Sequence, residues 1–323
     1  MGSTSGDDPR VAVVGSYNVG LTMQVPDFPG PGETVIGEGF AEGPGGKGSN
    51  QAIAAARLEA EARFVGRLGD DRYGDDAVDL WEREGIDTGG VRRGGEAHTG
   101  VGFVIVDDGG ENEITVAPGA NDALSGDDVR AEADAIRSAD VLLVQLEIGD
   151  DPVRAAVEVA DEADTTVILN PAPARELPAS ILERVDYLTP NEHEARTLAT
   201  EVDVEDDGGP GDAGGVEDDE KIAGALLELG VGTVALTRGG SGALLVTADG
   251  VESVATPAVD VVDTTGAGDS FNGALAVALA EGFGDREAVR FACAAGALAV
   301  TEAEVIPGLP EREAVDRLVE TTR

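Results

Sequence analysis

Apolar residues form two different patterns along this chain. From residue 125 onward, short apolar runs typical of buried strands alternate with longer segments whose apolar positions recur every three or four residues. Regular alternation of this kind is typical of a parallel sheet covered by helices. We therefore expect strands at residues 11–15, 63–65, 141–146, 166–169, 187–189, 233–236 and 244–247, and helices at residues 52–60, 73–84, 127–137, 152–161, 190–195, 221–229, 286–301 and 310–320.

A second pattern predicts a small separate sheet. Residues 26–46 are rich in glycine and proline, with a strand-like piece at 33–40. Residues 99–106 and 113–116 flank the turn Asp107-Asp-Gly-Gly110, which indicates a β-hairpin. These segments, from about 26–46 and 98–118, are expected to pair with each other. With 323 residues, of which 41% are hydrophobic, the chain can form one large core that carries such an appendage.

Acidic side chains far outnumber basic ones. The 64 Asp and Glu residues against 22 Lys and Arg give a net charge of −42 at pH 7, and such a surface repels nucleic acids and anionic membranes. Because the acids are spread along globular segments, we interpret them as an adaptation to molar salt, where the Debye length is ~3 Å. The run 201–220 is interpreted as a solvated acidic insertion.

Neither a membrane span nor a secretory signal is predicted. Apolar runs stay well below the ~18 residues that a span needs, and residues 1–10 are polar. We therefore expect a cytoplasmic protein. The single cysteine, Cys293, lies in an Ala-rich helical run and is expected to be a small buried apolar residue.

The stretch from Asp263 to Gly273 carries the clearest chemistry. The β-branched residues 259–262 predict a strand before it, and the apolar residues 271–279 predict a helix after it. Backbone N–H groups at the start of such a helix lack intrahelical acceptors and face negative charge, either a phosphate or a developing oxyanion. Asp269 at the mouth of this anion hole would repel a phosphate, but it could take a proton from an attacking hydroxyl. The alternative is a carboxylate that only caps the helix.

A second glycine-rich loop precedes the helix that starts near Ala52. It contains Lys47, one of only two lysines in the chain, which favours a functional role over a solvated surface position. The spacing Gly-x4-Gly-Lys-Ser/Thr of a P-loop is absent. Further along, Asn191 and Glu194 lie three residues apart and share one helical face. This pair is either a helix cap or part of a site.

The phrase Asp263-Thr-Thr-Gly-Ala-Gly-Asp-Ser-Phe271 resembles the C-terminal signature of the ribokinase/PfkB family of carbohydrate kinases. Gly45-Gly-Lys-Gly-Ser-Asn-Gln-Ala52 resembles the N-terminal signature of the ribokinases within that family. The resemblance extends from Gly15 to about Pro307. It implies a single α/β domain over residues 1–323, a three-layer α/β/α sandwich with a mainly parallel sheet. The small sheet would be a lid over the sugar, and commonly a contact between two copies in a homodimer.

The resemblance also assigns roles to individual residues. The catalytic base would be Asp269, with an anion hole formed by Gly266, Ala267 and Gly268. The sugar-binding residues would be Asn18, Gly45, Gly46, Lys47, Asn50, Glu147 and Asp269 itself. The nucleotide-binding residues would be Asn191, Thr237, Gly239, Gly242 and Gly268. Glu194 would hold Mg²⁺ through water, which suits an ion that keeps its waters, and Asp263 and Thr265 would belong to a monovalent-cation site.

Two departures from the family pattern affect these expectations. Ribokinases usually carry an Asp two residues after Asn18, and this chain has Gly20. Loss of that acceptor weakens ribose binding unless another group replaces it, and it makes room for a bulkier or anionic substituent. The loop 301–307, Thr-Glu-Ala-Glu-Val-Ile-Pro, has an acid where glycine is usual, which leaves the use of K⁺ open.

The sequence therefore predicts an ATP- and Mg²⁺-dependent kinase acting on the primary 5-hydroxyl of ribose or a closely related pentose. One alternative is a kinase for ribose 1-phosphate, which would give ribose 1,5-bisphosphate, or for a nucleoside. A more remote alternative is a non-catalytic sugar-binding regulator.

Overall fold

The computed structural model of the protein describes residues 8–199 and 216–322, and its central feature is a nine-stranded sheet. The strand order is β13-β12-β11-β10-β9-β8-β1-β4-β5. Neighbouring strands from β5 through β11 are parallel, while β12 and β13 extend one edge in antiparallel fashion. The strands are β1 Arg10–Val14, β4 Glu61–Leu68, β5 Asp87–Arg93, β8 Val141–Gln145, β9 Thr166–Asn170, β10 Tyr187–Leu188, β11 Thr233–Thr237, β12 Ala243–Thr247 and β13 Gly250–Val254.

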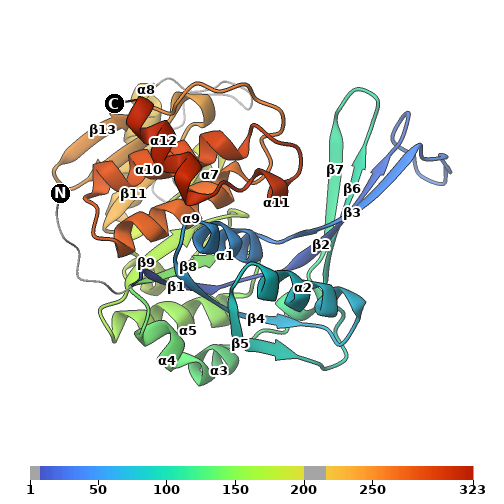
Figure 1. Ribbon diagram of the computed structural model, residues 1–323, viewed down its shortest axis with the longest axis horizontal. Helices are drawn as coiled ribbons and strands as arrows, with labels where there is room; N and C mark the ends of the chain where they lie inside the picture. Colours follow the sequence, from blue (N-terminus) through green and yellow to red (C-terminus); the bar gives the residue numbers. More distant parts are fainter. Residues whose placement is uncertain (1–7, 200–215, 323) are drawn as a thin grey trace.

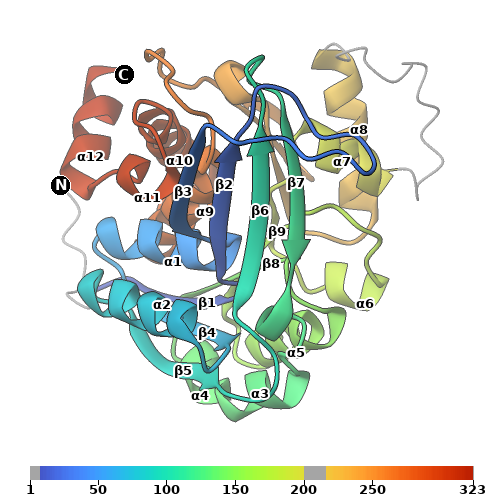
Figure 2. The ribbon, with the colours of Figure 1, turned by 90° about the vertical axis from the view of Figure 1, so that its right-hand side faces the viewer.

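Helices cover both faces of this sheet and bury two apolar clusters (Figures 1 and 2). One face packs against α1 Lys47–Arg57, α2 Arg72–Arg83, α9 Ala267–Ala280, α10 Asp285–Ala299 and α12 Arg312–Thr321. The other packs against α3 Gly126–Ala131, α4 Ala133–Arg137, α5 Asp150–Asp161, α6 Ala179–Leu182, α7 Glu192–Ala199 and α8 Val216–Glu228. The remaining helices are η1 Gly119–Asn121, η2 Gly239–Ser241 and α11 Val305–Gly308. This is the expected three-layer arrangement around a mainly parallel sheet.

A separate four-stranded sheet, which we call the lid, projects from the body of the molecule (Figure 1). Its strand order is β3-β2-β6-β7. The strands are β2 Asn18–Gln24, β3 Gly39–Gly45, β6 Gly100–Val106 and β7 Asn112–Ala117. The predicted hairpin is therefore present as β6 and β7. Because β2 begins four residues after β1 ends, the chain passes from the central sheet into the lid almost without a loop.

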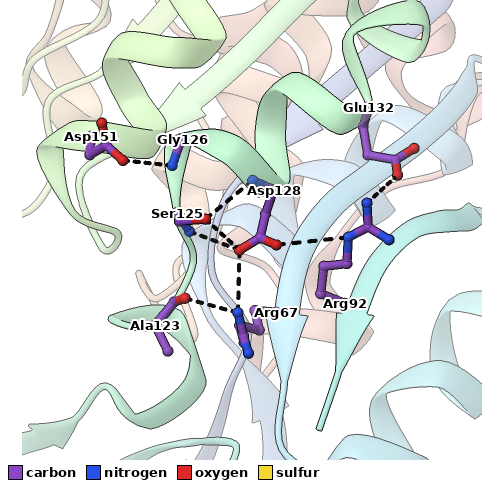
Figure 3. A network of polar contacts seen from close by, with 8 residues as sticks. All are labelled: Arg67, Arg92, Ala123, Ser125, Gly126, Asp128, Glu132 and Asp151. Carbon is purple, nitrogen blue, oxygen red and sulfur yellow. Dashed lines mark hydrogen bonds and ion pairs between the residues drawn. The ribbon is translucent and has the colours of Figure 1, made fainter. Parts of the chain in front are cut away.

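Ion pairs fasten the edge strand β5 and its neighbour β4 to α3 and the residue that follows it, as Figure 3 shows. Asp128 in α3 accepts a hydrogen bond from Arg67 Nη1 at 3.2 Å and lies 3.9 Å from Arg92 Nε. Arg92 also pairs with Glu132 at 3.1 Å. Ser125 and Asp128 form a reciprocal capping box at the start of α3. Because the chain enters β6 from β5, these contacts anchor the base of the lid to the core.

Several predicted elements are wrong or incomplete. Residues 259–262 form no strand, and the side chains of Val261 and Val262 are 63% and 62% exposed. The strand expected at 33–40 is instead β3, Gly39–Gly45, and β2 was not predicted. The edge strands β5 and β13 were not predicted. The helix expected at 127–137 is two helices that meet at Glu132.

The acidic run 201–220 lies largely outside the described residues. Its last part does not form a loop, because α8 begins at Val216, and Asp219 in this helix is buried. None of the helices in residues 8–199 and 216–322 has the length and apolar character needed to cross a bilayer.

Candidate active site

The carboxyl ends of several parallel strands meet beside the first turn of α9. Ser16 follows β1, Glu147 follows β8, and Asn170 ends β9. This edge is where parallel α/β sheets bind ligands. The loop before α9 turns at Gly266, whose φ of 83° places it in the left-handed region. A Cβ at Gly266 would also lie 2.6 Å from Val305 Cγ1, so glycine is required here for two reasons.

Asp269 lies in the first turn of α9 with its side chain directed at α1. Its two carboxylate oxygens accept hydrogen bonds from Asn50 Nδ2 at 2.8 Å and from Gln51 Nε2 at 3.0 Å. The N-cap residue of α9 is Gly266, without a side-chain cap. These contacts decide between the two interpretations of Asp269, because its carboxylate does not cap α9. It stands within a buried cluster of polar side chains at the helix N-terminus.

Burial raises the pKa of Asp269, and most of the neighbouring polar groups oppose that rise. Lys47, Asn50 and Gln51 lower the pKa of this carboxyl, while Glu147 raises it. For Lys47, burial alone would lower the pKa, but the nearby carboxylates of Asp269, Glu147 and Glu194 outweigh it and the pKa is raised. The ammonium group of Lys47 is therefore a charged group placed among three acids, which excludes a solvated surface role.

The carboxylate of Glu147 organises the side of the site next to the lid. Its Oε2 atom accepts hydrogen bonds from Ser16 Oγ at 2.5 Å, from the Lys47 backbone N–H at 2.9 Å and from Asn18 Nδ2 at 3.3 Å. The Asn18 side chain accepts in turn from Asn121 Nδ2 at 2.9 Å. Because the three donors converge on Oε2, the second carboxylate oxygen of Glu147 remains available to a ligand.

A cavity of about 220 Å³ joins the predicted sugar-binding and nucleotide-binding residues. Its lining includes residues from the loop before α9, from α1, and from the start of α7: Lys47, Asn170, Ala172, Thr189, Asn191, Glu194, Thr237, Thr264, Gly266, Gly268, Asp269 and Asn272. Asn191 forms an isolated parallel bridge with Thr237, which brings α7 against the end of β11. Asp269 therefore lies in the same cavity as the residues that we expected to bind the nucleotide.

Four of the glycines predicted as site residues fall into two classes. A Cβ at Gly46, with φ 91°, would lie 2.6 Å from Asn18 N, and one at Gly242 would lie 2.0 Å from Val254 O. These two allow close packing of the backbone. By contrast, a Cβ at Gly268 or Gly239 would have no atom within 4 Å. Their open surroundings leave the backbone accessible to a ligand.

Asn191 and Glu194 form a reciprocal helix cap. The Asn191 N–H donates to Glu194 Oε2 at 2.9 Å, and the Glu194 N–H donates to Asn191 Oδ1 at 2.8 Å. Within the described part of the chain, no group of three or more His, Cys, Asp or Glu side chains could hold a metal ion. The side chains of Asn191 and Glu194 therefore suit a Mg²⁺ that keeps most of its waters and binds phosphate oxygens. They do not suit an ion that is enclosed by carboxylates.

Asp263 and Thr265 lie on the loop before α9. Asp263 Oδ1 accepts from the Thr265 N–H and hydroxyl at 2.9 and 2.7 Å, and Oδ2 accepts from the Glu304 N–H at 3.2 Å. These hydrogen bonds, that of the Thr265 N–H above all, lower the pKa of Asp263. Glu304 has a φ of 67°, a conformation that favours glycine. Asp263 thus connects this loop to the segment in which we noted an acid in place of glycine.

Sequence reasoning missed several polar residues of this cluster. Gln51 and Gln145 are fully buried behind Asp269, and Asn272 accepts from Thr189 Oγ1 at 2.6 Å while donating to Gly268 O at 2.8 Å. A signal was present, because each of these amides stands in an otherwise apolar or Ala-rich element. Because buried polar side chains are normally hydrogen-bonded, their presence in such elements indicates a buried hydrogen-bond network.

Comparisons with known proteins find relatives over nearly the whole chain. The pfkB family carbohydrate kinase pattern matches residues 8–312. A ribokinase of Haemophilus influenzae is 37% identical over 303 residues, which are 94% of this chain and 96% of that protein. The structure of a ribokinase from Thermotoga maritima is 38% identical, with a TM-score of 0.85 over 97% of this chain and 99% of the other. That of Arabidopsis thaliana ribokinase complexed with ribose and ATP is 32% identical, with a TM-score of 0.87 and the same coverage.

Proposed function

The chain belongs to the pfkB family of carbohydrate kinases, and on that premise we propose that it transfers the γ-phosphate of ATP to the primary 5-hydroxyl of ribose or a closely related pentose. The observation that carries this proposal is the Asp269 carboxylate, buried beside the N-terminus of α9 in a cavity shared with Thr237 and Asn191. A carboxylate in that position is suited to accept a proton and is poorly suited to bind a phosphate by itself.

In the proposed reaction each residue has one task. Asn18, Asn50 and Glu147 orient the sugar hydroxyls, together with Lys47 and the backbone at Gly45 and Gly46. Asp269 accepts the proton of the 5-hydroxyl as the oxygen attacks the γ-phosphorus. The backbone N–H groups at Gly266, Ala267 and Gly268 stabilise the charge that develops on the transferred group. Phosphoryl transfer needs such positioning and electrostatic stabilisation more than covalent catalysis.

The nucleotide lies at the end of β11 in this proposal. Asn191, Thr237, Gly239 and Gly268 contact it, while Gly242 supports the turn by its close packing against Val254 O. Glu194 would hold Mg²⁺ through its water shell, and the bound ion would supply positive charge to the phosphates. Burial raises the pKa of Glu194, while the hydrogen bond from the Asn191 N–H and the positive charge of Lys47 lower it and favour the ionised carboxylate.

A monovalent cation site near Asp263 and Thr265 is part of the same proposal. The test is turnover at equal ionic strength in KCl, in NaCl and in tetramethylammonium chloride. Stimulation by K⁺ that is lost in Asp263→Asn would support the site. Equal rates in all three salts would contradict it.

We propose that the chain is a single α/β domain and that its lid covers the sugar. The lid would also form the contact between two copies of the chain. The strand registers place Asn18, Gly20 and Thr22 on the face that leads to Glu147, and Leu21 and Met23 on the other. On that outer face lie further apolar side chains from the neighbouring strands: Phe40, Val101, Phe103 and Ile105. Phe40 is 63% exposed. Such a contiguous apolar face is typical of a surface that another protein covers, and a second copy buries it in the proposed homodimer.

The net charge of −42 supports a protein that works in molar salt, in the cytoplasm of a halophile. Thermal unfolding at about 0.1 M and about 1 M KCl tests this, because the Debye length changes from ~10 to ~3 Å. A large rise in the unfolding midpoint is expected, and an unchanged midpoint would contradict the proposal.

The acceptor is tested by ATP turnover in molar salt with ribose, ribose 1-phosphate and nucleosides as alternatives, with ³¹P NMR to locate the new phosphate ester. Transfer to the 5-position of free ribose supports the main proposal. Transfer confined to ribose 1-phosphate or a nucleoside would indicate that the space at Gly20 accommodates a substituent on the sugar. Absence of transfer to all of them would favour the non-catalytic sugar-binding regulator.

A further inference from the structure

Two buried glutamines form a chain of amides behind the carboxylate of Asp269. Gln51 in α1 donates from Nε2 to Asp269 Oδ1 at 3.0 Å and to Asn170 Oδ1 at 3.2 Å. Gln145, the last residue of β8, donates from Nε2 to Gln51 Oε1 at 2.6 Å. Both glutamine side chains are 0% exposed, so neither of them touches a ligand in the cavity.

The direction of donation along this chain is fixed. A side-chain amide has one acceptor oxygen and two N–H donors, and in Gln51 all three take part in the contacts just described. If the Gln51 amide flipped, its oxygen would face the Asp269 carboxylate and the Asn170 oxygen. Asn170 opposes the flip, because its Nδ2 donates to Thr189 O and its Oδ1 therefore faces Gln51 as an acceptor, and the N–H of Gln145 bonds the Gln51 oxygen in this orientation. The chain therefore delivers an N–H to Asp269 and suits the ionised carboxylate, which only accepts hydrogen bonds.

Gln145 occupies its position at a cost in stability. It ends an otherwise apolar strand, and within the described residues its Oε1 has no hydrogen-bond partner. A buried acceptor without a partner destabilises the folded state. The side chain also fills the space beside Gly15, where a Cβ would lie 2.1 Å from that oxygen. An apolar side chain at position 145 would avoid the unpartnered oxygen, so packing alone does not explain this glutamine.

We propose that Gln51 and Gln145 are positioning residues that hold the Asp269 carboxylate ionised and oriented for proton transfer. Gln51 acts directly on the carboxylate, and Gln145 acts through Gln51. This inference rests on the proposed phosphoryl transfer. The charged groups around Asp269 are Lys47 from α1, Glu147 after β8 and Glu194 from α7. All three remain in place in the variants described next, so a change in titration reports on the amides.

Steady-state kinetics of Gln51→Met and Gln145→Met test the proposal over a range of pH. Methionine keeps the length of the side chain and removes the donor. Loss of a donor raises the pKa of Asp269, and because the base must be ionised, the acid limb of kcat/KM moves to higher pH. Gln51→Met is expected to lower kcat about 10–100-fold at pH 7 with little change in KM for the sugar. Gln145→Met is expected to move the limb in the same direction by less.

A matched control is available next to the base. Ser270 is 0% exposed and its hydroxyl has no partner within the described residues, so Ser270→Ala removes a buried polar group that does not touch Asp269. Its acid limb should coincide with that of the wild type. A limb that does not move in Gln51→Met would overturn the proposal, even if kcat fell.

Thermal unfolding measured against pH gives a readout that needs no turnover. Burial raises the folded-state pKa of Asp269 above its unfolded value, so its contribution to stability is present at low pH and is lost as pH rises through the folded pKa. The destabilisation caused by Gln51→Met should therefore grow with pH, and this growth should vanish in an Asp269→Asn background. Equal pH profiles for the wild type and Gln51→Met would contradict the role of Gln51.

The two readouts separate the two hypotheses. If the wild type transfers no phosphate to any acceptor, the proposed function fails while the unfolding profiles still decide the amide chain. If the wild type is active and both profiles of Gln51→Met match it, the amide chain fails and the proposed function stands.

Discussion

The N-terminal turn of α9 and the inner face of the lid border the same site, but they are built in opposite ways. Asp269 is 7% exposed and each of its oxygens accepts a hydrogen bond from a buried amide, of which Gln51 is itself held by Asn170 and Gln145. The inner face of the lid carries glycine at positions 20, 43, 45, 100 and 102; a Cβ at Gly43 would have no atom within 4 Å, whereas one at Gly100, at the base of the lid, would lie 2.2 Å from Asn18 Oδ1. The first region is fixed by interlocking contacts, and the second is kept open.

This contrast indicates a division of labour between chemistry and recognition. A base must be held in one geometry, because a small misplacement slows the reaction. The part of the inner face around Gly20, Gly43 and Gly102 carries no side chains and imposes little geometry on its ligand, so it can adapt to different sugars or substituents. We therefore expect substitutions near α9 to change kcat and substitutions in the lid to change the choice of substrate.

Asp269→Asn should have the largest effect. The amide cannot accept the hydroxyl proton, so kcat should fall about 10²–10⁴-fold, while calorimetric titration should still detect binding of ATP and ribose. The folded protein should be at least as stable as the wild type at pH 7, because burial of the charge is unfavourable. A loss in kcat smaller than about tenfold would place the base elsewhere.

Glu147→Gln should have the next largest effect, on sugar affinity. The substitution removes the charge on which donors from Ser16, Lys47 and Asn18 converge. We expect KM for the sugar to rise about 10–100-fold, with a smaller change in kcat. Glu96→Gln, which removes the same charge from an exposed position, is the control and should leave KM unchanged. Equal effects of the two variants would contradict a local role for Glu147.

Gly20→Asp tests the open face of the lid. A Cβ at Gly20 would lie 3.6 Å from Gly43 O, an ordinary contact, so the side chain fits without strain. If Gly20 makes room for a substituent on the sugar, the carboxylate added by Gly20→Asp should lower KM for free ribose about 3–10-fold and raise KM for ribose 1-phosphate. Gly20→Asn separates the hydrogen bond from the charge. Identical changes for both acceptors would show that the lid does not discriminate between them.

Phe40→Glu should have the smallest effect on turnover and should act on assembly. Phe40 lies on the outer face of the lid and Ile114 on the inner face, at similar exposures of 63% and 60%. Analytical ultracentrifugation should therefore find a dimer for the wild type and for Ile114→Glu, and a monomer for Phe40→Glu. Dissociation by both variants, or by neither, would remove the outer face as the interface.

The comparison also explains what could be predicted from sequence. The turn before α9 and the position of Asp269 are local features, encoded in a continuous phrase from Asp263 to Phe271, and they were placed correctly. The polar supports of Asp269 were not predicted, because Gln51 and Gln145 come from distant parts of the chain and meet only in three dimensions. Their separation in sequence hides a contact that only the parallel sheet creates.

The lid and the approach to α9 were predicted less well, for different reasons. β3 has the sequence Gly-Phe-Ala-Glu-Gly-Pro-Gly, whose composition favours a loop, yet it pairs with β2 along its whole length. Residues 259–262 have the opposite property, with strand-forming side chains and no neighbouring strand to pair with. Strand propensity depends on the available partner, which a single sequence does not reveal.

The arginines that each pair with two carboxylates, such as Arg92, also affect how this protein can evolve. Arg92 contacts both Asp128 and Glu132, and the same double arrangement recurs at Arg93, Arg130, Arg137 and Arg312. With 64 acids for 22 basic residues, loss of one acid leaves such an arginine with a second partner, whereas loss of the arginine leaves two carboxylates facing each other. Substitutions should therefore be tolerated more often at the acidic positions than at the arginines that they share, and related proteins should differ more at the former.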